Sequence, residues 1–177
     1  MEIEVLRIGQ RVVRDDRVTT HVALVARSFG AHKIYMNEVN PDIEKTISDI
    51  NKTWGGDFKI EIISEWKKII RERKNNGVKI IHLTMYGQNI NSVEMKIRNE
   101  DKILIVVGAE KVPREIYEMA DYNVAMGNQP HSEVSALGVL LDRIQQGKQF
   151  EVKFENPERV IIPKEYGKDV RMNKTTD

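Results

Sequence analysis

The sequence predicts an α/β fold, with a mainly parallel β-sheet covered by helices on both faces. Two observations indicate this class. Short apolar runs alternate along the chain with longer segments whose apolar residues recur at helical spacing. Such alternation is typical of strand–helix–strand units, in which helices pack on both sides of parallel strands. Because no internal repeat, low-complexity segment or linker interrupts the pattern, a single domain is expected over residues 1–148.

The first half of the chain contains three strand patterns and three helix patterns. Strands are expected at 4–8, 33–36 and 59–63, where short apolar runs are bounded by turn residues. A helical pattern follows each strand, and the three buried stripes are Val18, Val22, Val25, Ala26 and Phe29; Ile43, Ile47, Ile50 and Trp54; and Trp66, Ile69 and Ile70. Glycines follow each stripe and are expected to end the helices, at Gly30, Gly55-Gly56 and Gly77.

The second half repeats this alternation and adds a C-terminal extension. Strands are expected at 78–83, 103–107 and 122–126, and helices at 89–98 and from Ser132 to about Gln146. A turn is expected at Tyr86-Gly87. Beyond the last helix, residues 149–166 are expected to form an appended extended segment, and residues 167–177 a flexible polar tail.

Two strand-to-helix junctions in the second half are the strongest indication of a ligand site. One strand runs into Gly108-Ala109-Glu110-Lys111-Val112-Pro113, and the next runs into Gly127-Asn128-Gln129-Pro130-His131-Ser132-Glu133. A glycine lets the backbone turn sharply or approach a ligand closely. In open α/β sheets, ligands bind outside the carboxyl ends of the strands. The two loops are therefore expected to form two walls of one pocket.

Composition excludes some classes of protein and leaves others open. Lys and Arg number 28 against 27 Asp and Glu, so the net charge of +1 gives no indication of nucleic-acid binding. The absence of cysteine excludes disulfides, thiolate metal sites and a cysteine nucleophile. No apolar run approaches roughly 18 residues and the N-terminus has no apolar signal segment, so a cytoplasmic protein without membrane contact is expected.

The common nucleotide and metal motifs are missing. Neither the P-loop signature nor the glycine-rich dinucleotide turn occurs in the sequence, so a phosphate cradle is not expected. The four histidines, His21, His32, His82 and His131, have no spacing typical of zinc ligands, and no metal site is expected. A pocket that binds through backbone amides and an apolar slot suits a nucleoside.

Three segments resemble one known family. The segment from Arg17 to Leu24 and the two junctions, Gly108–Pro113 and Gly127–Val134, resemble the archaeal tRNA cytidine-56 2′-O-methyltransferase family of the SPOUT class. The resemblance covers residues 3–165 or so. It implies a SPOUT-type fold with a C-terminal trefoil knot over about residues 80–148, and S-adenosylmethionine as the cofactor. It also implies tRNA as substrate, methylated on the ribose of the T-loop cytidine, and a homodimer with the RNA site between subunits.

The resemblance also implies which residues contact the cofactor. They lie in the two junctions and at the end of an earlier strand, and are Leu83, Gly108, Ala109, Glu110, Lys111, Val112, Met126, Gly127, Asn128, Gln129, Pro130, His131, Ser132 and Glu133. The two glutamates would accept hydrogen bonds from ribose hydroxyls or offset the sulfonium charge. From the residues alone, ordinary turn chemistry also explains the glycines, and favourable charge at a helix start also explains the glutamates.

Arg17 is the candidate catalytic residue. SPOUT ribose methyltransferases place an arginine on the first helix near the 2′-hydroxyl, and the matching position in this chain is Leu24. Arg17 lies two helical turns earlier on the same non-core face. Its guanidinium would stabilise the developing alkoxide or hold an RNA phosphate, although it is a poor base because it does not lose its proton. A surface arginine paired with Asp15 or Asp16 is the alternative interpretation.

Contacts with RNA are expected from the arginines that precede this helix: Arg7, Arg11 and Arg14. Basic side chains can form a phosphate-binding face even on a neutral protein. A second basic stripe, Lys67, Arg71 and Lys74, is more typical of a solvated helix face. Tyr86 could stack on a base, although a packing role is the simpler expectation. A non-catalytic RNA-binding module of the same fold, and a SPOUT methyltransferase with another RNA target, remain as alternative functions.

Overall fold

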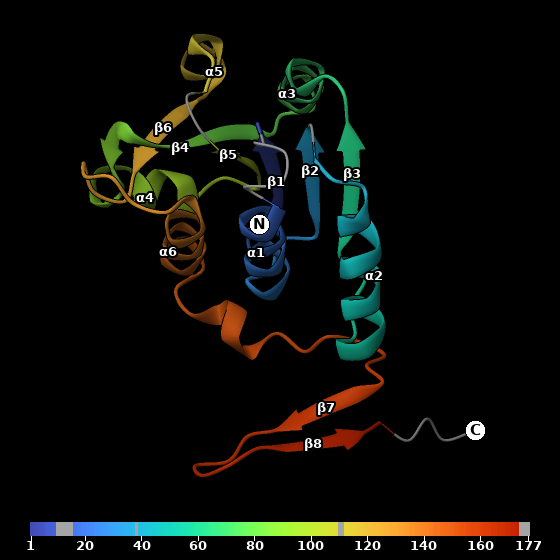
Figure 1. Ribbon diagram of the computed structural model, residues 1–177. Coiled ribbons are helices and arrows are strands. Elements are labelled where there is room, and N and C mark those ends of the chain that lie inside the picture. The colour runs from blue at the N-terminus through green and yellow to red at the C-terminus, as the bar shows by residue number, and fades with distance from the viewer. Residues whose placement is uncertain (10–15, 38, 110–111, 174–177) are drawn as a thin grey trace.

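Six parallel strands form one sheet in the computed structural model, which describes residues 1–9, 16–37, 39–109 and 112–173. The strand order is β3-β2-β1-β5-β4-β6 (Figure 1). The strands are β1 (Glu2–Ile8), β2 (Lys33–Asn37), β3 (Lys59–Ile63), β4 (Lys79–Asn89), β5 (Lys102–Gly108) and β6 (Tyr122–Ala125). Every pairing within this sheet is parallel, which confirms the α/β class.

Helices cover both faces of the sheet (Figure 1). On one face lie α1 (Asp16–Ser28), α2 (Asp42–Trp54), α4 (Ile90–Arg98) and α6 (Glu133–Gln145); on the other lie α3 (Trp66–Asn75) and α5 (Arg114–Met119). Because successive side chains of a strand point to opposite faces, β1 gives Ile3 and Val5 to one core and Leu6 and Ile8 to the other. Two apolar cores, one on each face, therefore pack the sheet against its helices.

The strand β4 departs from the expected pattern. A turn was expected at Tyr86-Gly87, but β4 continues to Asn89 and its register against β6 shifts between Leu83 and Gln88. At Gly87 the two strands approach so closely that a Cβ atom would lie 2.5 Å from the carbonyl carbon of Asn123. Residues 84–89 show no alternation of apolar and polar side chains, so the continuation of the strand could not be predicted from the sequence.

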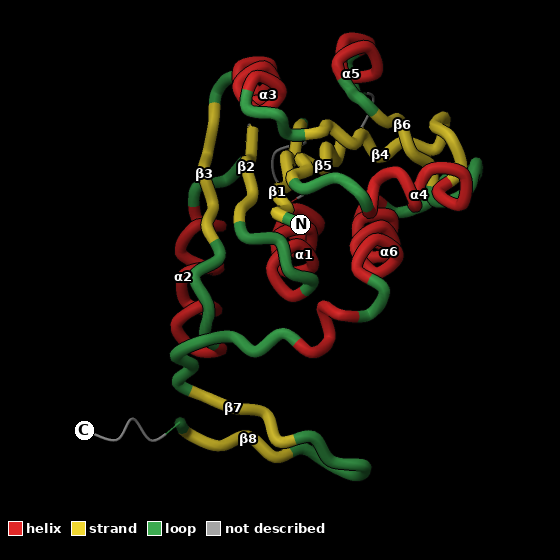
Figure 2. The backbone as a smooth tube through the Cα atoms, turned by 180° about the vertical axis from the view of Figure 1, so that it is seen from behind, coloured by secondary structure: helices red, strands yellow, loops and turns green. Residues whose placement is uncertain are grey.

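The C-terminal extension is partly ordered into a hairpin. After the short 3-10 helix η1 (Lys148–Glu151), the strands β7 (Arg159–Ile162) and β8 (Asp169–Met172) pair antiparallel. Figure 2 shows the hairpin projecting away from the sheet beyond one end of α2. The expectation of a flexible tail from residue 167 is thus wrong for β8, while residues 174–177 lie outside the described part of the chain.

The segment that leads to the hairpin packs on its own chain. The guanidinium of Arg27 lies 4.5 Å from the ring centroid of Phe154 and donates to Asn51 Oδ1 at 2.8 Å. The amide of Gly56 donates to the carbonyl of Glu155 at 2.8 Å. These contacts fix the segment against the ends of α1 and α2. Among the described residues, none of the helices combines the length and the apolar character needed to cross a bilayer.

Candidate functional site

A pocket of about 610 Å³ lies beside the middle of β4, the end of β5 and the start of α6. Its wall is made of residues from the two junctions, the middle of β4 and the helices α5 and α6: Leu83, Thr84, Met85, Tyr86, Gly108, Ala109, Val112, Tyr117, Pro130, His131, Glu133 and Ala136. The pocket therefore opens at the carboxyl edge of the sheet, where ligands of α/β proteins bind. The two junction loops do form two of its walls, as the sequence predicts.

Half of the expected cofactor-contacting residues line this pocket. They are Leu83, Gly108, Ala109, Val112, Pro130, His131 and Glu133. Glu110 and Lys111 lie outside the described residues. The lining is mixed, with apolar side chains from β4 and α6 and a carboxylate at the start of α6. Such a combination of apolar wall and a few polar groups is typical of small-molecule sites.

The other expected residues of the second junction support the loop and do not line the pocket. Asn128 donates from Nδ2 to the carbonyls of Met85 at 2.7 Å and Gly87 at 3.2 Å, which ties this loop to the irregular part of β4. Ser132 caps α6, because its Oγ accepts the amide of Val134. Gly127 has a φ of 108°, so its backbone conformation favours glycine even though the space around it is open. Two more members of the expected set, Met126 and Gln129, are likewise not part of the pocket wall.

Five lining residues were not predicted as site residues: Thr84, Met85, Tyr86, Tyr117 and Ala136. The hydroxyls of Tyr117 and Thr84 lie 3.1 Å apart, so α5 and β4 are joined at the pocket wall. Tyr86 is 74% exposed, which excludes the packing role considered for it. Its aromatic character was the one signal available from the sequence. Tyr117 lies on a six-residue helix, too short to give a periodic pattern.

Arg7 and Glu133 form an ion pair beside the pocket. Arg7 is fully buried on β1, and its Nη2 lies 3.1 Å from Oε1 of Glu133, whose side chain is 28% exposed. The pair fixes a carboxylate at the pocket wall, where it can meet a cationic or hydrogen-bond-donating ligand. The burial of Arg7 argues against the expected direct contact with RNA. Arg11 and Arg14 lie outside the described residues.

His82 is a buried neutral histidine next to the site. Asn123 Nδ2 donates to the carbonyl of Tyr117, so its Oδ1 accepts from Nδ1 of His82 at 2.8 Å. Nε2 then carries no proton and has no partner among the described residues. Burial lowers the pKa of His82, since a proton on Nε2 would bring an unpaired charge into the core. The described residues contain no group of three His, Asp or Glu side chains placed to hold a metal ion.

Arg17 is exposed near the start of α1 and does not line the pocket of its own chain. His21 and Ser28 on the same helix are exposed too, and Leu24 is partly buried. The non-core face expected for this helix is therefore confirmed. A catalytic role for Arg17 would require the pocket of another copy of the chain.

Comparison with known proteins identifies the family. The family model described as "tRNA ribose 2'-O-methyltransferase, aTrm56" matches residues 54–171. A tRNA (cytidine(56)-2'-O)-methyltransferase from Nitrosopumilus maritimus is 62% identical over 177 residues, which cover all of both chains. The chain belongs to this family. The resemblance seen in the sequence is thereby confirmed.

Solved structures of the wider class share the family's fold. A TrmH/SpoU tRNA-modifying enzyme from A. aeolicus superposes with a TM-score of 0.60 at 16% identity, covering 85% of this chain and 76% of that chain. The SpoU methyltransferase AviRb from Streptomyces viridochromogenes, in complex with the cofactor AdoMet, gives a TM-score of 0.57 at 10% identity, covering 81% of this chain and 57% of that one. At these identities the likeness concerns the fold alone.

Proposed function

We propose that this chain transfers a methyl group from S-adenosylmethionine to the ribose 2′-hydroxyl of cytidine 56 in tRNA. Membership of the family supports the reaction and the substrate, because the relative named for this activity matches along the entire chain. The observation that carries the proposal is the pocket between the two junctions. It lies at the sheet edge where the fold binds ligands, and it presents a carboxylate beside an apolar wall.

The lining residues fit the two ends of this cofactor. Leu83, Val112 and Ala136 offer an apolar surface for the adenine ring. Glu133 offers negative charge for the sulfonium or the ammonium group, and the ion pair with Arg7 holds it in place. A structure of the same fold has been solved with this cofactor, which further supports the assignment. Glu110 remains a second candidate acceptor for the ribose hydroxyls.

The reaction is a displacement at carbon that depends on positioning. The 2′-oxygen forms a bond to the methyl carbon as the carbon–sulfur bond breaks, and the hydroxyl proton leaves to a base or to water. Bound S-adenosylmethionine supplies the activated methyl group. The chain must hold the oxygen in line with the carbon–sulfur bond and stabilise the charge that develops on it. His82 is buried and therefore cannot reach the substrate as a base, whereas His131 lies on the pocket wall.

We further propose that the active protein is a homodimer in which Arg17 acts on the pocket of the partner subunit. The helices α1 and α6 pack against each other. Their outward faces carry apolar surface at Leu24, which is partly buried, and at Val139, which is 45% exposed. These faces are suited to pack against the same faces of a second copy around a two-fold axis.

A trefoil knot over about residues 80–148 is also proposed. The loop after β6 contacts the irregular part of β4 through the hydrogen bonds of Asn128, and this contact is compatible with threading.

The test is transfer of a labelled methyl group from S-adenosylmethionine to an unmodified tRNA transcript, with mapping of the modified nucleotide. A 2′-O-methyl group at cytidine 56 is expected. A matched transcript with 2′-deoxycytidine at that position should accept no label. Label at another nucleotide would contradict the assigned target, and no transfer to a tRNA that the folded protein binds would contradict the assigned reaction.

A further inference from the structure

The aromatic ring of Tyr86 lies at the mouth of the pocket that we propose binds the cofactor. Tyr86 belongs to the pocket wall and is nevertheless 74% exposed. Leu83 and Ala136, in the same wall, are buried, so the pocket runs from an apolar floor to an open rim. Pro130 and His131, from the second junction, are also exposed members of the wall. A substrate that approaches the pocket therefore meets Tyr86 before it reaches the interior.

The backbone on both sides of Tyr86 is held in place. Nδ2 of Asn128 donates to the carbonyl oxygens of Met85 at 2.7 Å and Gly87 at 3.2 Å. At Gly87, an added Cβ would lie 2.5 Å from the carbonyl group of Asn123, so this part of β4 packs directly against β6. The ring of Tyr86 is thus attached to a fixed piece of backbone, which lowers the ordering cost when the ring binds a ligand.

The ring of Tyr86 is not used by the fold. Among the described residues, no aromatic ring pairs with it and no cationic side chain lies over it. Tyr117, the other tyrosine of the pocket wall, packs edge-to-face on His82 with ring centroids 4.6 Å apart. Exposure alone is common for single surface side chains, and Tyr166 is 82% exposed as well. Its position at the pocket rim, on a fixed backbone, distinguishes Tyr86.

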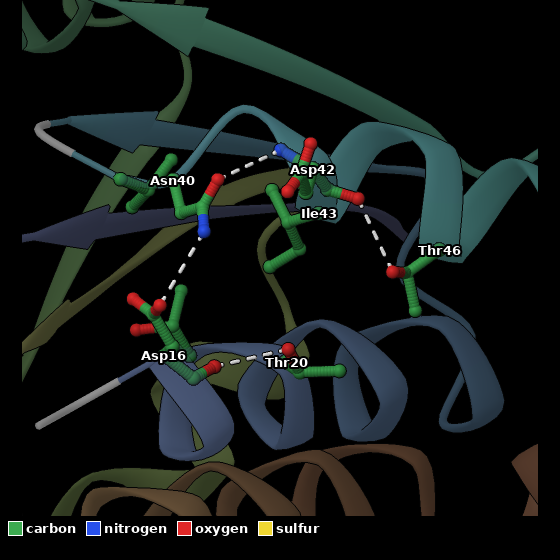
Figure 3. A pocket seen from close by; sticks show the side chains of 8 residues that line it. Asp16, Thr20, Asn40, Asp42, Ile43 and Thr46 are labelled. Atoms are coloured by element: carbon green, nitrogen blue, oxygen red, sulfur yellow. Dashed lines mark hydrogen bonds between the residues drawn. The ribbon is translucent and has the colours of Figure 1, made fainter. Parts of the chain in front are cut away.

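A smaller cavity of about 190 Å³ at the starts of α1 and α2 offers no comparable surface (Figure 3). Of the described side chains that form its wall, none is aromatic. Its polar groups bond to one another, since Asn40 donates to Asp16 at 3.4 Å and accepts the amide of Asp42 at 3.0 Å. Thr46 donates to the carbonyl of Asp42 at 3.2 Å. These bonds join the first turns of the two helices, so a structural role accounts for them.

We propose that Tyr86 stacks on the base of the nucleotide whose ribose is methylated, and so positions the 2′-hydroxyl at the pocket mouth. The inference rests on the proposed function, because it takes the nucleotide from tRNA. Bases that are splayed out of an RNA loop bind proteins by stacking on aromatic side chains. A base on the ring of Tyr86 leaves its own ribose beside the pocket. Because every base has a flat face, Tyr86 positions the nucleotide and does not select cytidine.

Three variants separate stacking from a structural role. Tyr86→Phe keeps the ring and Tyr86→Leu removes it; Tyr166→Leu is the control, because Tyr166 is an exposed tyrosine outside the pocket wall. We expect Tyr86→Leu to lower kcat/KM for tRNA about tenfold, whereas Tyr86→Phe and the control stay within about twofold of wild type. Affinity for S-adenosylmethionine should be unchanged in all three. Wild-type kcat/KM in Tyr86→Leu, or an equal loss of cofactor affinity, would overturn the proposal.

A fluorescent base tests the contact itself. Pyrrolocytosine replaces cytidine 56 in the transcript, and its emission falls when it stacks on an aromatic ring. With S-adenosylhomocysteine bound, so that no methyl transfer occurs, emission in the complexes of wild type and Tyr86→Phe should be lower than in the complex of Tyr86→Leu. Equal emission in the three complexes would exclude the stack. A wild-type protein that quenches the base but does not methylate tRNA would contradict the proposed reaction and support this inference.

Discussion

At the scale of single residues, the ion pair of Arg7 and Glu133 places a charged group at the wall of the pocket that we propose binds the cofactor. The two residues are 126 positions apart, and the sequence assigned them separately to RNA and to the cofactor. A buried guanidinium without its partner is costly, so the ion pair keeps the side chain of Glu133 in place at the pocket wall.

Replacing Glu133 with glutamine should weaken cofactor binding. The amide keeps the shape of the side chain and loses the negative charge that we propose faces the sulfonium or ammonium group. We expect the dissociation constant for S-adenosylmethionine to rise about tenfold, measured by isothermal titration calorimetry. Glu118→Gln is the control, because this exposed glutamate pairs with Arg114 on α5 outside the pocket wall. Equal affinity in the two variants would remove Glu133 from cofactor binding.

The buried histidine predicts how stability depends on pH. The pKa of His82 is lowered in the folded protein, whereas in the unfolded chain it has its ordinary value near 6.5. Just below pH 6.5, His82 therefore binds a proton more readily in the unfolded chain than in the folded protein. The unfolded state then holds more protons, and stability falls as the pH drops from about 6.5 toward the lowered folded pKa. Urea unfolding at pH 7.5 and 5.5 should show a larger loss in wild type than in His82→Gln. The difference is limited to about 1.4 kcal/mol per pH unit. Equal losses would show that His82 does not titrate on unfolding.

At the scale of elements, local patterns predicted the strands and helices that have apolar periodicity. The apolar stripe of α6 and the apolar runs of β1 and β5 indicate from the sequence which residues are buried, and each element is found where expected. Residues 84–89 and β8 could not be predicted, because close backbone approach and hairpin pairing form them without an apolar pattern. The same holds for the site. Junction residues were predictable from their glycines, whereas Tyr117 reaches the pocket only through tertiary packing.

Replacing Gly87 with alanine should disturb the pairing of β4 with β6 at its register shift. The added Cβ would lie 2.5 Å from backbone atoms of Asn123 and Val124, so one of the strands must move. We expect a loss of about 1–3 kcal/mol in urea unfolding and weaker cofactor binding, because Asn128 anchors the pocket loop to Gly87. Gly77→Ala is the control, since only its positive φ opposes a side chain. Normal cofactor binding by Gly87→Ala would show that this part of β4 does not support the pocket.

At the scale of the whole molecule, the proposed site takes Arg17 from a second copy of the chain. Within one chain this arginine lies on α1 and is not part of the pocket wall. Gly108, by contrast, belongs to the wall, where a larger side chain would reduce the space proposed for the cofactor. The two residues therefore report on different subunits of the proposed dimer.

Mixing two inactive variants should restore activity. Arg17→Ala is expected to lower turnover far more than cofactor affinity, and Gly108→Val to abolish cofactor binding. A mixed dimer has one site with an intact pocket and an intact arginine from the other subunit. Methyl transfer by the mixture, after unfolding and refolding together, should exceed that of either variant refolded alone. Activity no higher than the sum of the separate variants would contradict a shared site.

The central position of β1 has a consequence for how the protein is made. Glu2 pairs with Lys102, so β1 is synthesised about 100 residues before its partner β5. At about 5–20 residues per second this delay is roughly 5–20 s. During that time the apolar edge of β1 toward β5 is open and can pair with other chains. A nascent chain that stalls before residue 102 is therefore a natural client for chaperones that bind unpaired strands.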